Sequence, residues 1–196
     1  MLKWVSALSA CSLVLSACGR PEATAAVANS AVVDSIFPLA EEIRRFEAAY
    51  LVEPVRELKD RAGSRDELVQ RFVQALESRD TATLQELTLD AAEFITFYFP
   101  HSVYARPPYR QNPAFVWFQF QQNGHKGIGR ALARYGGLPS GFRGYHCASE
   151  PVRQGPVTLW QDCVVAWGLQ PDSIRLFGTI LEHAGRFSFV SFANDL

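Results

Sequence analysis

The sequence contains no apolar run long enough to cross a membrane. Its most apolar stretch runs from Val5 to Ala17, about 13 residues, whereas a membrane-spanning helix needs about 20. Lys3 precedes this stretch, and no acidic residue occurs before Glu22. A positive start, a short apolar centre and a small-residue end are typical of a secretory signal peptide. We therefore expect residues 1–17 to be a cleaved signal peptide.

The sequence also lacks an excess of charge of one sign. The chain has 19 basic and 20 acidic residues, and removal of residues 1–17 takes away one lysine and no acid. This balance differs from the strong basic excess of a general nucleic-acid-binding protein, so we expect no nucleic-acid partner. The remaining chain is long enough for one domain with a buried core and a tether.

Cysteine is scarce, with four residues in the whole chain. Cys11 lies in the predicted signal peptide and Cys18 follows that peptide directly, which leaves Cys147 and Cys163. In an exported chain, two remaining cysteines are most simply one disulfide bond. Metal binding is the alternative, but no C-x-x-C pair or ordered histidine spacing supports it. We expect neither a metal nor a cofactor.

Familiar catalytic motifs are missing as well. There is no G-x-S-x-G, no H-E-x-x-H, and the glycines of residues 124–129 lack the G-K-[ST] ending of a phosphate-binding loop. His101 and His146 are the candidate acid or base groups, because histidine titrates near neutral pH. Glu93 and Glu182 are expected to be solvated. Enzymatic activity is therefore uncertain, and we favour a protein without it.

Acidic residues are absent between Glu93 and Glu150, whereas six basic residues occur there. Three of these recur at intervals of four residues and form one basic face if the segment is helical. Two interpretations stay open: the cations balance the acidic residues 34–93, or they bind an anionic ligand or partner. The candidate ligand-binding residues are basic and aromatic: Tyr98, Arg106, Tyr109, Arg110, Trp117, Lys126, Arg130, Arg134, Tyr145 and Trp160.

Helical patterns occupy most of the first half of the chain. Apolar residues recur at helical spacing from Ile36 to Tyr50, and this helix either packs on the main domain or docks a partner. Ser64 and Glu67 form a capping-box pattern before a second helix, and Asp80 can cap a third. Residues 114–122 are ambiguous, but we favour a helix. A further helix is expected at 126–135, with Asn123-Gly124 interrupting the two.

Strand patterns occur at residues 93–99 and throughout the part that follows Ser140. Turn residues divide this last part into four expected strands, at 141–149, 157–169, 174–182 and 186–193. Pairing Cys147 with Cys163 in a hairpin places its centre at Gly155, which lies in one of the predicted turns. The disulfide and the turn signals therefore predict the same register.

The segment Leu15-Ser16-Ala17-Cys18 resembles the lipobox of bacterial lipoproteins. This resemblance implies cleavage before Cys18 and acyl chains on that residue, which anchor the protein in a membrane of the bacterial cell envelope. Gly19 after the cysteine implies delivery to the outer membrane, on its periplasmic side, in an organism that has one. Residues 18–33 are small and polar, and we expect them to be a lipidated, flexible tether.

The order of helices and strands is similar to that of the nuclear transport factor two-like superfamily. The resemblance covers residues 64–196 and implies an α+β fold, with helices packed on a curved, mostly antiparallel, cone-like sheet around a pocket. Residues 34–63 are expected to be a separate amphipathic helical segment. Both faces of strands 174–182 and 186–193 are apolar, so a second copy of the chain is one candidate to cover the sheet as a homodimer.

These features lead to one preferred function and two alternatives. We expect a lipid-anchored envelope protein whose domain binds a small, potentially anionic ligand or an envelope partner and catalyses no reaction. The first alternative is an isomerase or dehydratase that uses the cone pocket, as the superfamily resemblance implies. The second is a structural or assembly lipoprotein.

Overall fold

The computed structural model describes residues 37–59, 62–147, 150–168 and 173–193. Residues Phe37–Leu196 form one compact unit. The predicted signal peptide, Cys18 and the predicted tether at 18–33 lie outside the described residues. None of the described helices is both long enough and apolar enough to span a membrane.

The helices lie in the first two thirds of the unit. They are α1 (Leu39–Tyr50), α2 (Arg65–Glu77), α3 (Thr81–Glu86), α4 (Ala91–Glu93), the π-helical turn η1 (Phe94–Tyr98), the 3₁₀ turns η2 (Phe99–His101) and η3 (Val103–Ala105), and α5 (Pro113–Tyr135). Two predicted caps are confirmed: the Ser64 hydroxyl accepts the Glu67 amide at 3.1 Å, and the Asp80 carboxylate accepts the Thr83 amide at 3.0 Å. The Glu67 side chain differs from the predicted capping box, because its carboxylate accepts the amide of Gly63, at 2.8 Å, in place of the amide of Ser64.

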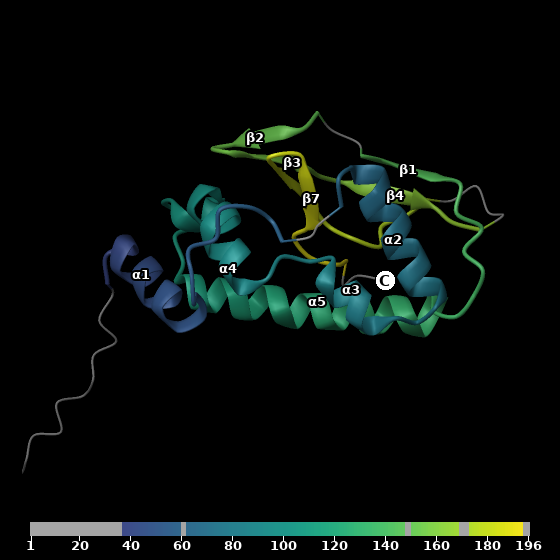
Figure 1. Cartoon of the computed structure of the whole chain (residues 1–196), viewed down its shortest axis with the longest axis horizontal. Coiled ribbons are helices and arrows are strands. Elements are labelled where there is room, and N and C mark those ends of the chain that lie inside the picture. Colours follow the sequence, from purple (N-terminus) through teal and green to yellow (C-terminus); the bar gives the residue numbers. More distant parts are fainter. Residues whose placement is uncertain (1–36, 60–61, 148–149, 169–172, 194–196) are drawn as a thin grey trace, which may run out of the picture. The chain divides into compact units, whose positions relative to one another are not determined.

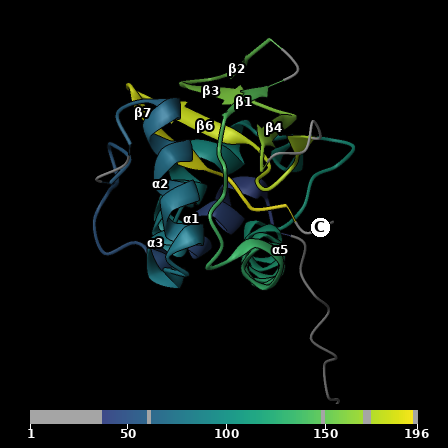
Figure 2. The same cartoon turned by 90° about the vertical axis from the view of Figure 1, so that its right-hand side faces the viewer.

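The strands form two antiparallel sheets, which confirms the α+β class. One sheet has the order β1 (Gly144–Cys147), β4 (Cys163–Ala166), β5 (Ser173–Ile174). The other has the order β2 (Val152–Gln154), β3 (Val157–Trp160), β6 (Ile180–His183), β7 (Arg186–Phe189). Figures 1 and 2 show the strands gathered on one side of the unit and α5 along the other. A cone shape stays a prediction.

The expected strand at 157–169 is wrong as a single element. The chain leaves β3 after Trp160 and enters β4 at Cys163, and these two strands belong to different sheets. Asp162 between them has a positive φ of 51°, a left-handed conformation that interrupts an extended strand. The expected strand at 174–182 is likewise wrong as a single element, because β5 ends at Ile174 and β6 begins at Ile180. The strand β2 lies outside all four expected ranges, and the described residues after Ser140 contain seven short strands.

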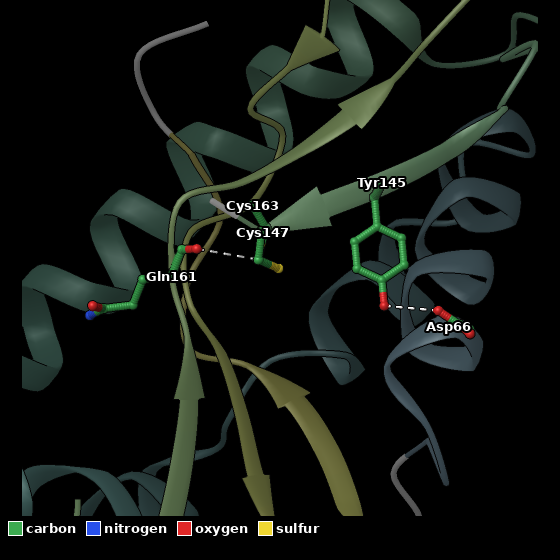
Figure 3. The surroundings of a disulfide bond; sticks show 5 residues. All are labelled: Asp66, Tyr145, Cys147, Gln161 and Cys163. Atoms are coloured by element: carbon green, nitrogen blue, oxygen red, sulfur yellow. Dashed lines mark hydrogen bonds between the residues drawn. A yellow bond between two sulfur atoms is a disulfide. The ribbon is translucent and has the colours of Figure 1, made fainter. Parts of the chain in front are cut away.

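The predicted disulfide is confirmed. Cys147 and Cys163 face each other across β1 and β4, and their sulfur atoms are 2.06 Å apart (Figure 3). The predicted turn is also present, because Gly155 has a φ of 58° and Gln154 faces Val157 across it. The pairing shifts by one residue between these two places, and the two parts of the hairpin lie in separate sheets.

Replacing Cys147 by serine is expected to lower the free energy of unfolding by about 3 kcal/mol. The bond closes a loop with a sequence separation of 16 residues, and its loss releases entropy in the unfolded chain. Denaturant titration of wild type and variant measures the difference. Wild-type protein treated with a reducing agent should unfold at the same midpoint as the variant. A variant as stable as the oxidised wild type would contradict this account.

The expected strand at 93–99 is wrong, because this segment is helical. Asp90 accepts the Glu93 amide at 2.8 Å and donates its own amide to the Glu93 carboxylate at 3.0 Å, so a capping box starts a helix here. Phe94, Ile95, Phe97 and Phe99 are buried, and the β-branched and aromatic composition therefore reflects burial on several sides.

The expectation that Glu93 is solvated is also wrong. Its side chain is fully buried, and its carboxylate accepts the Lys59 amide at 2.8 Å as well as the Asp90 amide. A buried carboxylate needs such hydrogen bonds to offset the loss of water. Glu93 therefore joins the chain before α2 to the start of α4.

Residues 114–122 are helical, as favoured, but the expected interruption at Asn123-Gly124 is absent. α5 continues without a break to Tyr135 and ends at Gly136, as predicted. Glycine costs roughly 1 kcal/mol within a helix, and packing of both halves of α5 outweighs that cost. Gly127 allows α5 to approach the backbone of Ala193 closely, because a Cβ at this position would lie 2.5 Å from the Ala193 carbonyl oxygen.

Buried side chains gather in three clusters. The first surrounds Phe72 of α2 and joins it to β4, β6, β7 and the middle of α5. The second joins α1, η1 and the start of α5, where Phe46 packs on Phe94 with ring centroids 6.0 Å apart. The third lies between Phe97 and the strands β3 and β6. Of the two roles considered for the first helix, packing on the domain is the one observed.

Candidate binding groove

Four of the five aromatic candidates divide between two places in the fold, and the fifth, Tyr109, is exposed. Tyr98 and Trp117 belong to the cluster around Phe94, whereas Tyr145 and Trp160 pack against the cluster around Phe72. Because η1 and α5 supply the first pair and strands supply the second, the four side chains do not line a shared pocket.

A groove of about 390 Å³ lies beside the middle of α5, a volume within the range of small-molecule sites. Four segments form it: the end of α1, the chain from α3 to α4, the middle of α5, and residues 190–192. Its aromatic lining consists of Tyr50, Trp117, Phe120 and Phe192. Its polar lining consists of Gln85, Thr88, Asp90, Gln121, His125 and Ser191.

Aromatic packing behind the groove holds its wall in place. Phe94 contacts both Trp117 and Phe120, with ring centroids 5.2 and 5.5 Å apart. Phe120 also contacts Tyr98 at 5.4 Å, and burial raises the pKa of the Tyr98 hydroxyl well above its usual range. Tyr98 is therefore a neutral packing residue. Within the described residues, the buried indole nitrogen of Trp117 has no hydrogen-bond partner.

Asp90, the acidic residue that lines the groove, makes contacts with other parts of the chain. One carboxylate oxygen of Asp90 accepts the Glu93 amide at 2.8 Å, and the other lies 2.6 Å from the Lys59 ammonium. Asp90 therefore caps α4 and pairs with a cation. The remaining polar lining is amide, hydroxyl and imidazole, groups that both donate and accept hydrogen bonds. This lining suits a neutral polar ligand.

A second hollow of about 360 Å³ lies beside the disulfide and brings together Tyr145, His146 and Trp160. The Tyr145 hydroxyl donates to the Asp66 carboxylate at 2.9 Å (Figure 3). Burial is the larger cause and this hydrogen bond the smaller one, and together they raise the pKa of Tyr145 to about 12. The Arg65 guanidinium lies over the Trp160 ring, 4.6 Å from its centre. Tyr145 is thus protonated at neutral pH and serves as a hydrogen-bond donor.

The two histidine candidates lie on different elements. His146 is exposed on β1, beside the disulfide. His101 is half-buried at the end of η2, and its ring packs so close to Gly155 that a Cβ at that glycine would lie 2.5 Å from Nδ1. His101 therefore supports the turn between β2 and β3.

The basic candidates stay outside the groove. Arg106 donates to the carbonyl of His101, and Arg110 donates to the carbonyl of Phe37 at 2.5 Å. Arg110 also lies 3.5 Å from Glu42, which is the type of balancing pair considered for the basic residues. The other candidates are exposed: Tyr109, Lys126, Arg130 and Arg134. Within the described part of the chain, no ion pair joins Lys126, Arg130 or Arg134 to an acidic residue.

The structure is an α+β domain with a partly aromatic, largely uncharged groove. Comparison with protein-family models, with curated proteins and with solved structures finds no match. Among the described residues, no group of three or more histidine, cysteine or acidic side chains has the arrangement of a metal site.

Proposed function

We propose that this chain is a lipid-anchored protein of a bacterial cell envelope that binds a small, neutral polar ligand in the groove beside α5 and does not convert it. The lipobox-like segment ending at Cys18 supports the anchor and the location. The groove supports the binding role. The nuclear transport factor two-like resemblance is compatible with this role, but the proposal does not depend on it.

The observation that carries the proposal is the combination of side chains in the groove. Tyr50 and Phe120 offer ring surface, and Gln85 and Gln121 offer amides that can donate and accept hydrogen bonds. A ligand with one apolar face and several hydroxyl or amide groups matches both. An N-acetylated sugar has this chemistry, so we propose a saccharide of the envelope as the ligand class.

Binding fits the groove better than isomerase or dehydratase chemistry does. Such chemistry requires a group placed to take up or release a proton. The carboxylate of Asp90 is held by the α4 cap and by Lys59, and Tyr98 lies behind the wall with a raised pKa. His125 is the remaining titratable side chain contributed to this groove by α5. A test for binding should therefore also follow the ligand for chemical change.

Calorimetric titration of the full chain with chito-oligosaccharides tests the proposal. Gln121→Ala is expected to weaken binding roughly tenfold, because a bound polar group loses a hydrogen-bond partner. Gln119→Ala is the matched control, since Gln119 is exposed on α5 and does not line the groove. The saccharide should be recovered unchanged. No binding, or equal affinities of the two variants, would contradict the proposed site and ligand class.

A further inference from the structure

The outer face of α5 is exposed, basic and partly aromatic. We define it by these residues: Phe115, Phe118, Gln119, Gln122, Lys126, Arg130 and Arg134. Phe115 and Phe118 are 52% and 56% exposed, although phenylalanine is usually buried. α5 contains no acidic residue. Figures 1 and 2 show α5 on the side of the unit opposite the strands.

Apolar and basic residues are segregated along this face. The two phenylalanines lie in the first two turns of the helix, whereas Lys126, Arg130 and Arg134 follow at intervals of four residues in its second half. A helix of 23 residues is about 35 Å long, so the face presents an extended surface. Aromatic side chains are enriched at the headgroup level of membranes, and basic side chains are attracted to anionic lipid, so a face that carries both suits a membrane surface.

The described chain begins beside the aromatic end of this face. Arg110 stands three residues before Pro113, the first residue of α5, and its guanidinium binds the carbonyl of Phe37. Eighteen residues separate Cys18 from Phe37. As the coil that its composition predicts, a segment of this length spans roughly 25 Å. An acyl anchor on Cys18 therefore keeps the start of α5 within reach of the bilayer surface.

We propose that the outer face of α5 lies on a bilayer surface that contains anionic phospholipid. Phe115 and Phe118 insert at the level of the headgroups, and the ammonium of Lys126 and the guanidinium groups of Arg130 and Arg134 bind lipid phosphates. This inference rests on the proposed Cys18 anchor, which supplies the membrane within reach. Basic residues near an anionic surface add to such an anchor, since stable attachment benefits from two signals.

This orientation leaves the groove open to the aqueous compartment. Six residues of α5 line the groove: Trp117, Phe120, Gln121, Gly124, His125 and Ile128. Trp117, Gln121, Gly124 and Ile128 recur at three and four residues on a stripe opposite Phe115 and Lys126, and Phe120 and His125 flank that stripe. A protein resting on α5 thus presents its groove away from the lipid. Among the described residues, no acidic side chain forms an ion pair with Lys126, Arg130 or Arg134. The phosphates of an anionic membrane supply the negative charge that these three cations then bind.

A fluorescent probe on the outer face tests the inference. We use the full chain with Cys11 and Cys18 replaced by serine, so that acylation cannot contribute, and attach a polarity-sensitive fluorophore at Gln122→Cys. Val152→Cys, on the edge strand β2, is the matched control site. With phosphatidylglycerol-containing vesicles, the probe at 122 should shift to the blue and the probe at 152 should not. Phosphatidylcholine vesicles should give a much smaller shift.

Charge removal provides the second measurement. Lys126→Gln with Arg130→Gln, in the Gln122→Cys background, should raise the lipid concentration needed for the half-maximal shift roughly 30-fold. High salt should weaken the wild-type shift. No shift at 122, equal shifts at 122 and 152, or an unchanged midpoint after charge removal would overturn the inference. A shift seen only with an added acidic protein would overturn it too, and would assign the face to a protein partner. None of these outcomes depends on whether Cys18 is acylated.

Discussion

Replacement of Phe72 by alanine is expected to lower the free energy of unfolding by about 3–5 kcal/mol. Phe72 is 1% exposed, and its ring packs against Phe177, Phe189 and Phe192 with centroid distances of 5.5, 5.7 and 5.5 Å. Alanine removes the ring at the point where α2 meets the end of the chain. The remaining rings are held by two segments, Phe177 between β5 and β6, and Phe189 and Phe192 at and just after the end of β7, and they cannot collapse into the cavity without moving those segments.

Denaturant titration at neutral pH measures this loss, and Phe118→Ala is the matched control. Both residues are phenylalanines in helices, but Phe118 is more than half exposed and should change the stability in lipid-free solution by about 0.5 kcal/mol or less. Equal losses for the two variants would mean that Phe72 does not occupy the centre of the core. An intact disulfide should be verified in both proteins, because its loss would add to the effect.

Local signals in the sequence predict the parts of the fold that depend on neighbouring residues. The caps at Ser64 and Asp80 rest on hydrogen bonds to amides three residues away, and the end of α5 at Gly136 is likewise local. The pairing of Cys147 with Cys163 is predictable because these are the two cysteines that follow Cys18 in the sequence, and a turn lies between them. In each case a few residues contain the physical cause of the structure.

Tertiary packing determines the parts that the sequence does not reveal. Residues 93–99 have strand composition, yet Asp90 starts a helix and the buried side chains of this segment pack on two of the core clusters. Packing likewise carries α5 through Asn123-Gly124. The division of the expected strand at 157–169 depends on Asp162, whose positive φ has no clear signal in a single sequence.

The sequence predicts the candidate site less well than it predicts the fold. Tyr50, Gln85, Gln121 and Ser191 come together in the groove from segments far apart in the sequence, and no spacing pattern relates them. Of the candidate ligand-binding residues, Trp117 alone is part of the groove lining. The absence of acids from residues 94 to 149 indicated a real surface feature, but the structure places its cations outside the groove.

Replacement of Cys18 by serine is expected to move the protein from the membrane fraction to the soluble fraction. A thiol is required for acylation in a lipoprotein, and several acyl chains give stable attachment where one chain is marginal. The outer face of α5 alone should retain the variant only weakly. Fractionation is therefore done at high salt, which screens the contact between basic side chains and anionic lipid.

Cys11→Ser is the matched control, because Cys11 lies within the predicted signal peptide and should be absent from the mature protein. This variant should remain in the membrane fraction. Mass spectrometry of the wild type should find an amino terminus at Cys18 that carries fatty acids. An intact Met-Leu-Lys start without fatty acid, or membrane retention of Cys18→Ser at high salt, would remove the basis for the anchor. It would not alter the groove, since all the residues that line it belong to the unit Phe37–Leu196.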